Sequence, residues 1–170
     1  IVKMGFRFNF LGGTIPAEIG MLTKVAAMDL SSNTLSGVIP STIGLMTNLE
    51  TLFLDTNRLW GAIPNDLSRL TNLTLFSIND NFMGGALPED LGNLTELALL
   101  GVHKNSIGGS IPTGIGNMKK LRRFTCYDNE LSGKIPSEMG GASLLGEFNA
   151  YSNAFTGTLP TEIGLLTSLW

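Results

Sequence analysis

A short pattern of hydrophobic and polar positions recurs along the whole chain, and residues 49–72 show it clearly. Within residues 51–55 the positions alternate, with Leu52 and Leu54 on one side and Phe53 on the other, which is the period of a β-strand with one buried face. Apolar residues then recur at spacings of three or four and predict a returning arm of turns and short helical pieces: Leu59, Ile63, Leu67 and Leu70. A single unit cannot bury this frame, so we expect successive units to stack over one continuous core.

Three residue types recur at a constant step of 24 positions. All seven prolines keep this step. So do an asparagine column and a glycine column, formed by Asn9, Asn33, Asn57, Asn81, Asn105, Asn129 and Asn153 and by Gly13, Gly37, Gly61, Gly85, Gly109, Gly133 and Gly157. Side-chain amides can hydrogen-bond to backbone groups where a strand ends, glycine permits a positive φ, and proline stops a strand. A fixed period of about 20–50 residues is the signature of a solenoid or a related array.

The repeat makes specific structural predictions. Because every coil turns in the same direction, the strands should be parallel, and the general handedness rule predicts a right-handed coil. We expect strands centred near Met4, Met28, Leu52, Phe76, Leu100, Phe124 and Phe148. The asparagine column should be buried and hydrogen-bonded, because each amide can serve its own coil and the next.

Residues 46–64 carry the full pattern L-x-x-L-x-x-L-x-L-x-x-N-x-L-x-G-x-I-P, with Met46 in place of the first leucine. This pattern resembles the leucine-rich repeat family in its plant-type form of 24 residues, and the resemblance covers essentially the whole chain. It implies an α/β solenoid with a parallel sheet on the concave face, short helical or 3-10 turns on the convex side, and a small second sheet at the x-G-x-I-P segment. The family serves many binding roles, so the resemblance predicts the fold more sharply than the function.

The repeat also predicts the domain organisation. Seven units of 24 account for all but two of the 170 residues, so we expect one solenoid domain over residues 1–170. Ile1 matches Leu49 in the repeat, and Leu169 with Trp170 would begin an eighth unit. Plant-type members usually carry cysteine-bearing caps, and neither terminal cap is present. The expectation is therefore a fragment, or the ordered part, of a longer protein.

Charge and chemistry narrow the function. A formal net charge of −3 argues against a nucleic-acid surface, and no contact of this segment with a membrane is expected. His103 is the single histidine, so no metal site with several imidazoles can form. No nucleophile accompanied by an orienting acid is recognisable either, so we predict no enzyme activity, no metal and no cofactor.

Two kinds of special side chain remain outside the frame. Cys126 matches the inward position of Leu54, so it is interpreted as a small buried hydrophobic residue. Two N-x-T sequons begin at Asn72 and Asn93. Either could carry a glycan at an outer turn if the protein is secreted.

The outward positions of the strands vary while the frame stays constant, as a binding scaffold requires. Two clusters of ligand-binding candidates emerge from these columns. The aromatic–arginine cluster contains Phe53, Asp55, Arg58, Trp60 and Phe82. The histidine–tyrosine cluster contains His103, Lys104, Tyr127, Asp128 and Tyr151. Aromatic residues with arginine are typical of interface hot spots.

A purely structural interpretation competes with each cluster. In the second cluster, Lys104 could pair across strands with Asp80 and Asp128. Tyr127 and Tyr151 could simply stack on each other. The first cluster could likewise consist of ordinary surface residues, since single exposed aromatic residues are common.

We consider three functions. The leading hypothesis is a protein- or peptide-binding module of a receptor-like or secreted plant or algal protein, located outside the cell or at its surface. The alternative is a structural subunit of a larger assembly, inside the cell or an organelle, whose concave face is covered by one fixed partner. Ice or polysaccharide binding would require a flat threonine array, and the partial column that includes Thr23, Thr47 and Thr71 is interrupted by Lys119 and Ser143.

Overall fold

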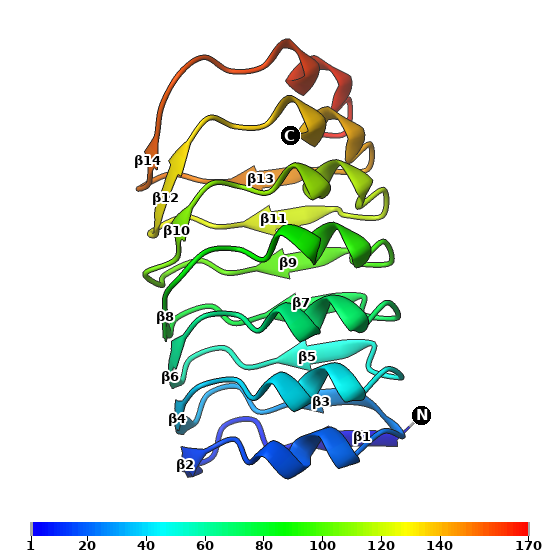
Figure 1. Cartoon of the computed structure of the whole chain (residues 1–170), viewed down its shortest axis with the longest axis vertical. Helices are drawn as coiled ribbons and strands as arrows, with labels where there is room; N and C mark the ends of the chain where they lie inside the picture. The colour runs from blue at the N-terminus through cyan, green and yellow to red at the C-terminus, as the bar shows by residue number, and fades with distance from the viewer. Residues whose placement is uncertain (1, 170) are drawn as a thin grey trace.

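The computed structural model describes residues 2–169, which stack as seven coils into an elongated solenoid (Figure 1). Each coil contributes one strand to a seven-stranded parallel sheet, called here the main sheet, in the order β1-β3-β5-β7-β9-β11-β13. The strands are β1 (Val2–Gly5), β3 (Val25–Asp29), β5 (Thr51–Phe53), β7 (Leu75–Ser77), β9 (Leu99–Gly101), β11 (Arg123–Thr125) and β13 (Glu147–Asn149). All seven predicted strand centres are confirmed.

A second set of short parallel strands follows the asparagine column. It forms two groups, β2 (Gly12–Thr14), β4 (Thr34–Gly37), β6 (Arg58–Gly61) and β8 (Phe82–Met83), then β10 (Gly108–Gly109), β12 (Glu130–Gly133) and β14 (Ala154–Phe155). Only an isolated bridge between Ala86 and Gly108 links the two groups. Partners in the main sheet are 24 residues apart, as in Leu52 with Phe76, whereas Trp60 pairs with Phe82, 22 residues later.

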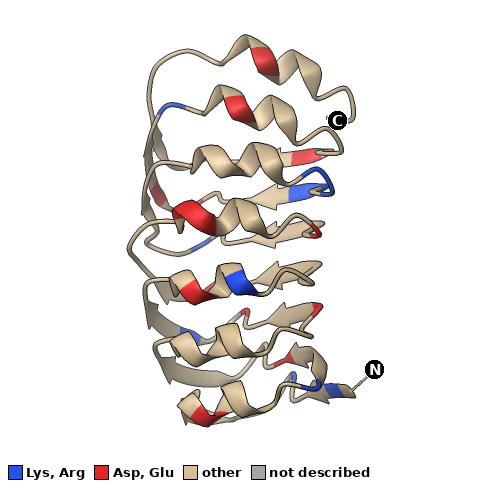
Figure 2. Cartoon of the chain, turned by 45° about the vertical axis from the view of Figure 1, so that its right-hand side comes forward, with Lys and Arg blue, Asp and Glu red and all other residues tan. Residues whose placement is uncertain are grey.

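Each coil returns through a 3-10 helix that starts directly after a repeat proline. The helices are η1 (Ala17–Met21), η2 (Ser41–Leu45), η3 (Asn65–Arg69), η4 (Glu89–Asn93), η5 (Thr113–Asn117), η6 (Ser137–Gly141) and η7 (Thr161–Leu165). The proline supplies a φ suited to the start of a helix, as at Pro64 with φ −66°. Figure 2 shows acidic side chains recurring on these helices, as at Glu18, Asp66 and Glu138.

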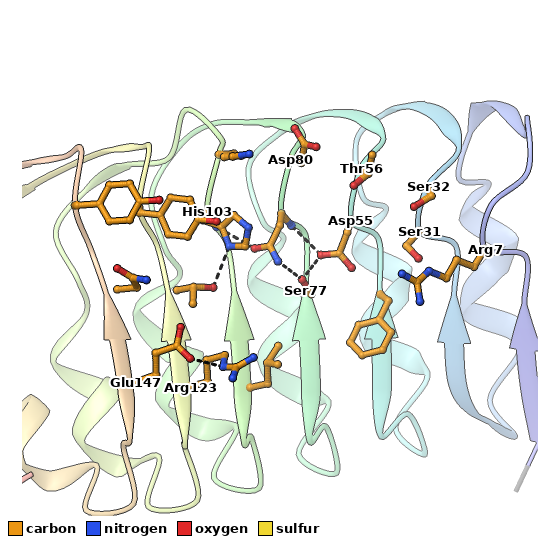
Figure 3. Close-up of a pocket in the computed structure, with 18 residues that line it drawn as sticks. Arg7, Ser31, Ser32, Asp55, Thr56, Ser77, Asp80, His103, Arg123 and Glu147 are labelled. Carbon is orange, nitrogen blue, oxygen red and sulfur yellow. Dashed lines mark hydrogen bonds and ion pairs between the residues drawn. The ribbon is translucent and has the colours of Figure 1, made fainter. Parts of the chain in front are cut away.

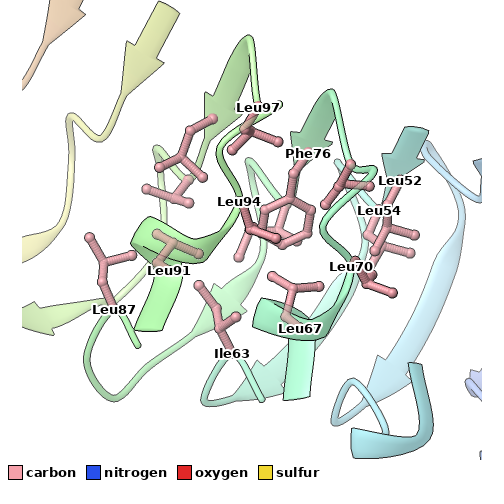
Figure 4. Packing of buried hydrophobic residues seen from close by; sticks show 14 of the residues in the cluster. Leu52, Leu54, Ile63, Leu67, Leu70, Phe76, Leu87, Leu91, Leu94 and Leu97 are labelled. Carbon is pink, nitrogen blue, oxygen red and sulfur yellow. The ribbon is translucent and has the colours of Figure 1, made fainter. Parts of the chain in front are cut away.

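The core is one continuous column between the main sheet and the 3-10 helices (Figure 4). In the coil of β5, Leu52, Leu54, Leu67 and Leu70 are each at most 1% exposed. The hydrophobic frame predicted from the repeat is therefore the core. Cys126 is fully buried in the same column, and burial raises the pKa of its thiol to about 12. It packs as a small hydrophobic side chain.

The asparagine column is hydrogen-bonded throughout but only partly buried. In Asn81, Nδ2 donates to the carbonyl oxygens of Leu54 and Ile78, and Oδ1 accepts from the N–H of Leu59. Asn33, Asn57 and Asn81 are buried, whereas the three later members are half-buried and Asn9 is exposed. The prediction of general burial was wrong for Asn9, because no described coil precedes it and its amide bonds only within its own coil.

The ends of the described region add two observations. Leu169 packs against the core outside any strand, and Trp170, the second residue of the expected eighth unit, lies outside the described residues, as does Ile1. Across residues 2–169, every helix is too short and too polar to cross a bilayer.

Candidate ligand-binding face

The outward face of the main sheet contains a groove of about 610 Å³ that runs across the strands from Arg7 to Tyr151 (Figure 3). It forms because alternate strand residues point away from the core and meet their counterparts from the next coil. Phe53 and Asp55 line it from one coil, and His103 and Lys104 from another.

A chain of hydrogen bonds crosses the groove floor. The carboxylate of Asp55 accepts from the hydroxyl of Ser77 and, at 3.1 Å, from the N–H of Asn79. The side chain of Asn79 donates to Ser77 Oγ at 2.6 Å and accepts from the N–H of His103 at 3.0 Å. His103 Nδ1 then lies 3.0 Å from Thr125 Oγ1. The network connects four coils and fixes the side chains that a ligand would meet.

Three aromatic rings stack at one end of the groove. The His103 and Tyr127 rings are 4.2 Å apart at 14°, and the Tyr127 and Tyr151 rings are 4.5 Å apart at 15°. The predicted stacking of the two tyrosines is confirmed, and His103 extends it. Stacking holds each ring in one orientation, so the stack offers a rigid aromatic edge that also carries hydroxyl groups.

Burial affects two ionisable groups in the groove. Burial raises the pKa of Asp55, and the hydrogen bonds from Ser77 and Asn79 oppose this change. Burial also lowers the pKa of His103, against the attraction of Asp55. Both shifts favour the neutral form, so ligand contacts here are hydrogen bonds and ring contacts more than ion pairs.

The rim of the groove has an unusual backbone that the sequence did not indicate. Lys104 and its counterparts adopt left-handed φ values near 50–57°, a column formed by Phe8, Ser32, Thr56, Asp80, Lys104, Asp128 and Ser152. The ion pairs among residues 2–169 are Asp66–Arg69, Glu96–Lys120 and Arg123–Glu147. The alternative that Lys104 pairs with Asp80 or Asp128 was therefore wrong, because the left-handed turn holds these side chains at the rim.

The structure separates the aromatic–arginine cluster into two parts. Phe53 and Asp55 lie in the groove, whereas Arg58, Trp60 and Phe82 belong to β6 and β8 of the second set of strands. Trp60 and Phe82 pair in register and are 55% and 66% exposed. The histidine–tyrosine cluster stays together, with Asp128 on the rim.

Several groove residues were missed by the sequence reasoning. Ser77, Asn79 and Thr125 occupy outward columns, but their small polar side chains gave no signal by themselves. Arg123 Nε lies 2.6 Å from Glu147 Oε2, a pair that the column arithmetic could have found because the residues are one repeat apart. No group of three potential metal ligands occurs within residues 2–169.

Comparison with known proteins defines the class of protein. The family model described as Leucine Rich Repeat matches residues 25–46 and 48–70. The plant peptide hormone receptor RGFR1 in complex with RGF2 has a TM-score of 0.98 and 33% identity over 100% of this chain and 27% of that chain. The Arabidopsis receptor kinase HAESA, in complex with the peptide hormone IDA and the co-receptor SERK1, gives 0.94 and 34% over 98% and 28%.

A plant ice-binding protein is more distant, with a TM-score of 0.65 and 27% identity over 94% of this chain and 66% of that chain. The comparison with curated proteins found no match. The chain belongs to the leucine-rich repeat family and carries plant-type repeats. It spans less than a third of the length of the receptor chains that it resembles.

Proposed function

We propose that this segment binds a peptide or protein ligand through the groove of the main sheet, as part of a receptor-like or secreted plant protein. The groove carries the proposal, because its side chains vary from coil to coil and contribute nothing to the repeating core. The contacts proposed are Phe53, Asp55, His103, Lys104, Tyr127 and Tyr151. Similar receptors are described as complexes with peptide hormones, which supports this class of ligand.

Arg58, Trp60 and Phe82 are proposed as a second contact beside the groove, with Asp128 at its rim. Two large aromatic side chains opposite each other in water gain nothing for the core, so a partner that covers them would stabilise the complex. The alternative of a structural assembly subunit would use the same surfaces with one permanent partner.

Secretion is proposed together with this function. Asn72 and Asn93 are both exposed, so neither side chain would have to leave the core to carry a glycan. Mass spectrometry of the chain secreted from plant cells, compared with Asn72→Gln and Asn93→Gln variants, tests this assignment. Ice binding is less well supported, because the threonine column lies in turns and not on a sheet face.

The test is a selection of displayed random short peptides on the whole chain. Peptides that bind should lose about 2 kcal/mol or more of binding free energy with Tyr127→Ala or Phe53→Ala, since these residues are the aromatic anchors. Arg58→Ala tests the second contact. Melting curves should stay near wild type, because none of these side chains belongs to the core.

Arg69→Ala, on the far side in η3, is the matched control and should leave affinity unchanged. Failure to select any peptide that depends on Tyr127 or Phe53 would overturn the proposed function. Large destabilisation with unchanged affinity would show that the replaced residues serve packing.

A further inference from the structure

A second hollow of about 460 Å³ adjoins the groove at the edge where the strands β7, β9, β11 and β13 begin. Leu99, Arg123 and Glu147 line both spaces, so the two are continuous. The ion pair between Arg123 and Glu147 stands at their boundary (Figure 3). An extended chain lying in the groove can therefore continue into the hollow.

The walls of this hollow are aliphatic. Leu75 and Leu99 are half-buried at outward positions of adjacent strands, and Leu144 is 41% exposed in the turn before β13. Ala98 and Gly146 leave the space open because their side chains are small or absent. The hollow thus has the size and lining for an aliphatic side chain.

Leu144 departs from the repeat at its own position. The other six coils place a polar residue there, namely Lys24, Asn48, Asn72, Glu96, Lys120 and Ser168. This column lies in exposed turns, so the fold does not need a leucine in it. An exposed aliphatic residue beside Leu75 and Leu99 is accounted for by a contact outside the solenoid.

The charge around the hollow is basic. Figure 2 shows basic residues gathered at the loop that leads into β11. Lys120 lies 2.5 Å from Glu96, and Arg123 is paired with Glu147, but Arg122 takes part in none of the ion pairs found among residues 2–169. Its exposed guanidinium lines the hollow and complements a carboxylate.

We propose that this hollow binds an aliphatic side chain of the peptide ligand, with an acidic side chain of the same peptide next to it on Arg122. This inference rests on the proposed peptide-binding function and deepens it. The peptide then extends from the ring stack of His103, Tyr127 and Tyr151, across the Arg123–Glu147 pair, to the aliphatic walls. Ligands of this chain share an aliphatic residue beside Asp or Glu at a fixed distance from the segment that contacts the rings.

The experiment uses the displayed peptides selected on the whole chain, resynthesised with acetylated and amidated ends so that only side chains carry charge. Leu144→Asn restores a residue type already present in the same column, and it should weaken binding about tenfold, which is about 1.4 kcal/mol. Arg122→Ala should weaken binding similarly, and only for peptides that keep the acidic residue. Arg69→Ala is the arginine control and should have no effect.

The outcomes separate the two proposals. Selected peptides that need Tyr127 but show no aliphatic–acidic pair, and that ignore both Leu144→Asn and Arg122→Ala, would overturn this inference and leave the proposed function intact. Selection of no peptide that depends on Tyr127 or Phe53 would overturn both. Loss of affinity with Leu144→Asn and Arg122→Ala, at unchanged melting temperature, would establish the hollow as a ligand site.

Discussion

At the residue scale, Asp55 shows how the groove balances burial against hydrogen bonding. Burial raises the pKa of its carboxyl above 3.8, while Ser77 and Asn79 donate to the ionised form. The folded state therefore holds the Asp55 proton more tightly than the unfolded chain does. The contribution of Asp55 to the free energy of unfolding is greatest below about pH 3.8 and falls as the pH rises through the folded pKa.

Asp55→Asn removes this titration but keeps an oxygen that accepts from Ser77 and Asn79. We expect the variant to gain stability relative to wild type when the pH is raised from below 3.8 to neutral. Urea unfolding of both proteins at the two pH values measures the difference, and all other carboxylates cancel in the comparison. If the variant instead loses relative stability at neutral pH, the two hydrogen bonds outweigh the cost of burial.

At the element scale, the central strands of the main sheet act through their inward residues. Leu52 lies in register between Met28 and Phe76, and all three are fully buried. Leu52→Ala should cost roughly 2–5 kcal/mol through the cavity it leaves. Because coils contact mainly their neighbours, hydrogen exchange should rise most around Met28 and Phe76.

Phe53→Ala is the control in the same strand, since its side chain points outward and is only half-buried. It should cost clearly less. Unchanged exchange around both Met28 and Phe76 in the Leu52→Ala variant would contradict nearest-neighbour coupling.

At the scale of the whole molecule, the spacing of coils depends on glycines in the 3-10 helices. A Cβ at Gly44 would overlap the carbonyl oxygen of Asp66 and lie 2.8 Å from its Cβ in the next coil. Gly44→Ala must therefore push η2 and η3 apart, and we expect a loss of roughly 1–3 kcal/mol, as for overpacked cores. Ser68 occupies the same column in η3, so the restriction applies coil by coil.

Gly164 provides the control, because a Cβ there would meet no atom within 4 Å. Gly164→Ala should leave the melting temperature near wild type, and thermal unfolding of the two variants compares them directly. Equal melting of both would show that the helices can separate without cost.

The sequence by itself determined the solenoid, its seven main strands and its core, because each coil repeats the same local instructions at a step of 24. Leu52 and Leu54 are inward in the structure for the reason visible in the sequence, which is alternation along a strand. The stacking of Tyr127 on Tyr151 was also predictable, since main-sheet neighbours keep that step.

Only the tertiary structure decided how the remaining side chains group. The second strands pair at a step of 22, which sets Trp60 opposite Phe82 and removes both from Phe53 in the groove. The left-handed backbone at Lys104 keeps its charge at the rim. These outcomes depend on how one coil is displaced against the next, a relation between distant segments that no single repeat encodes.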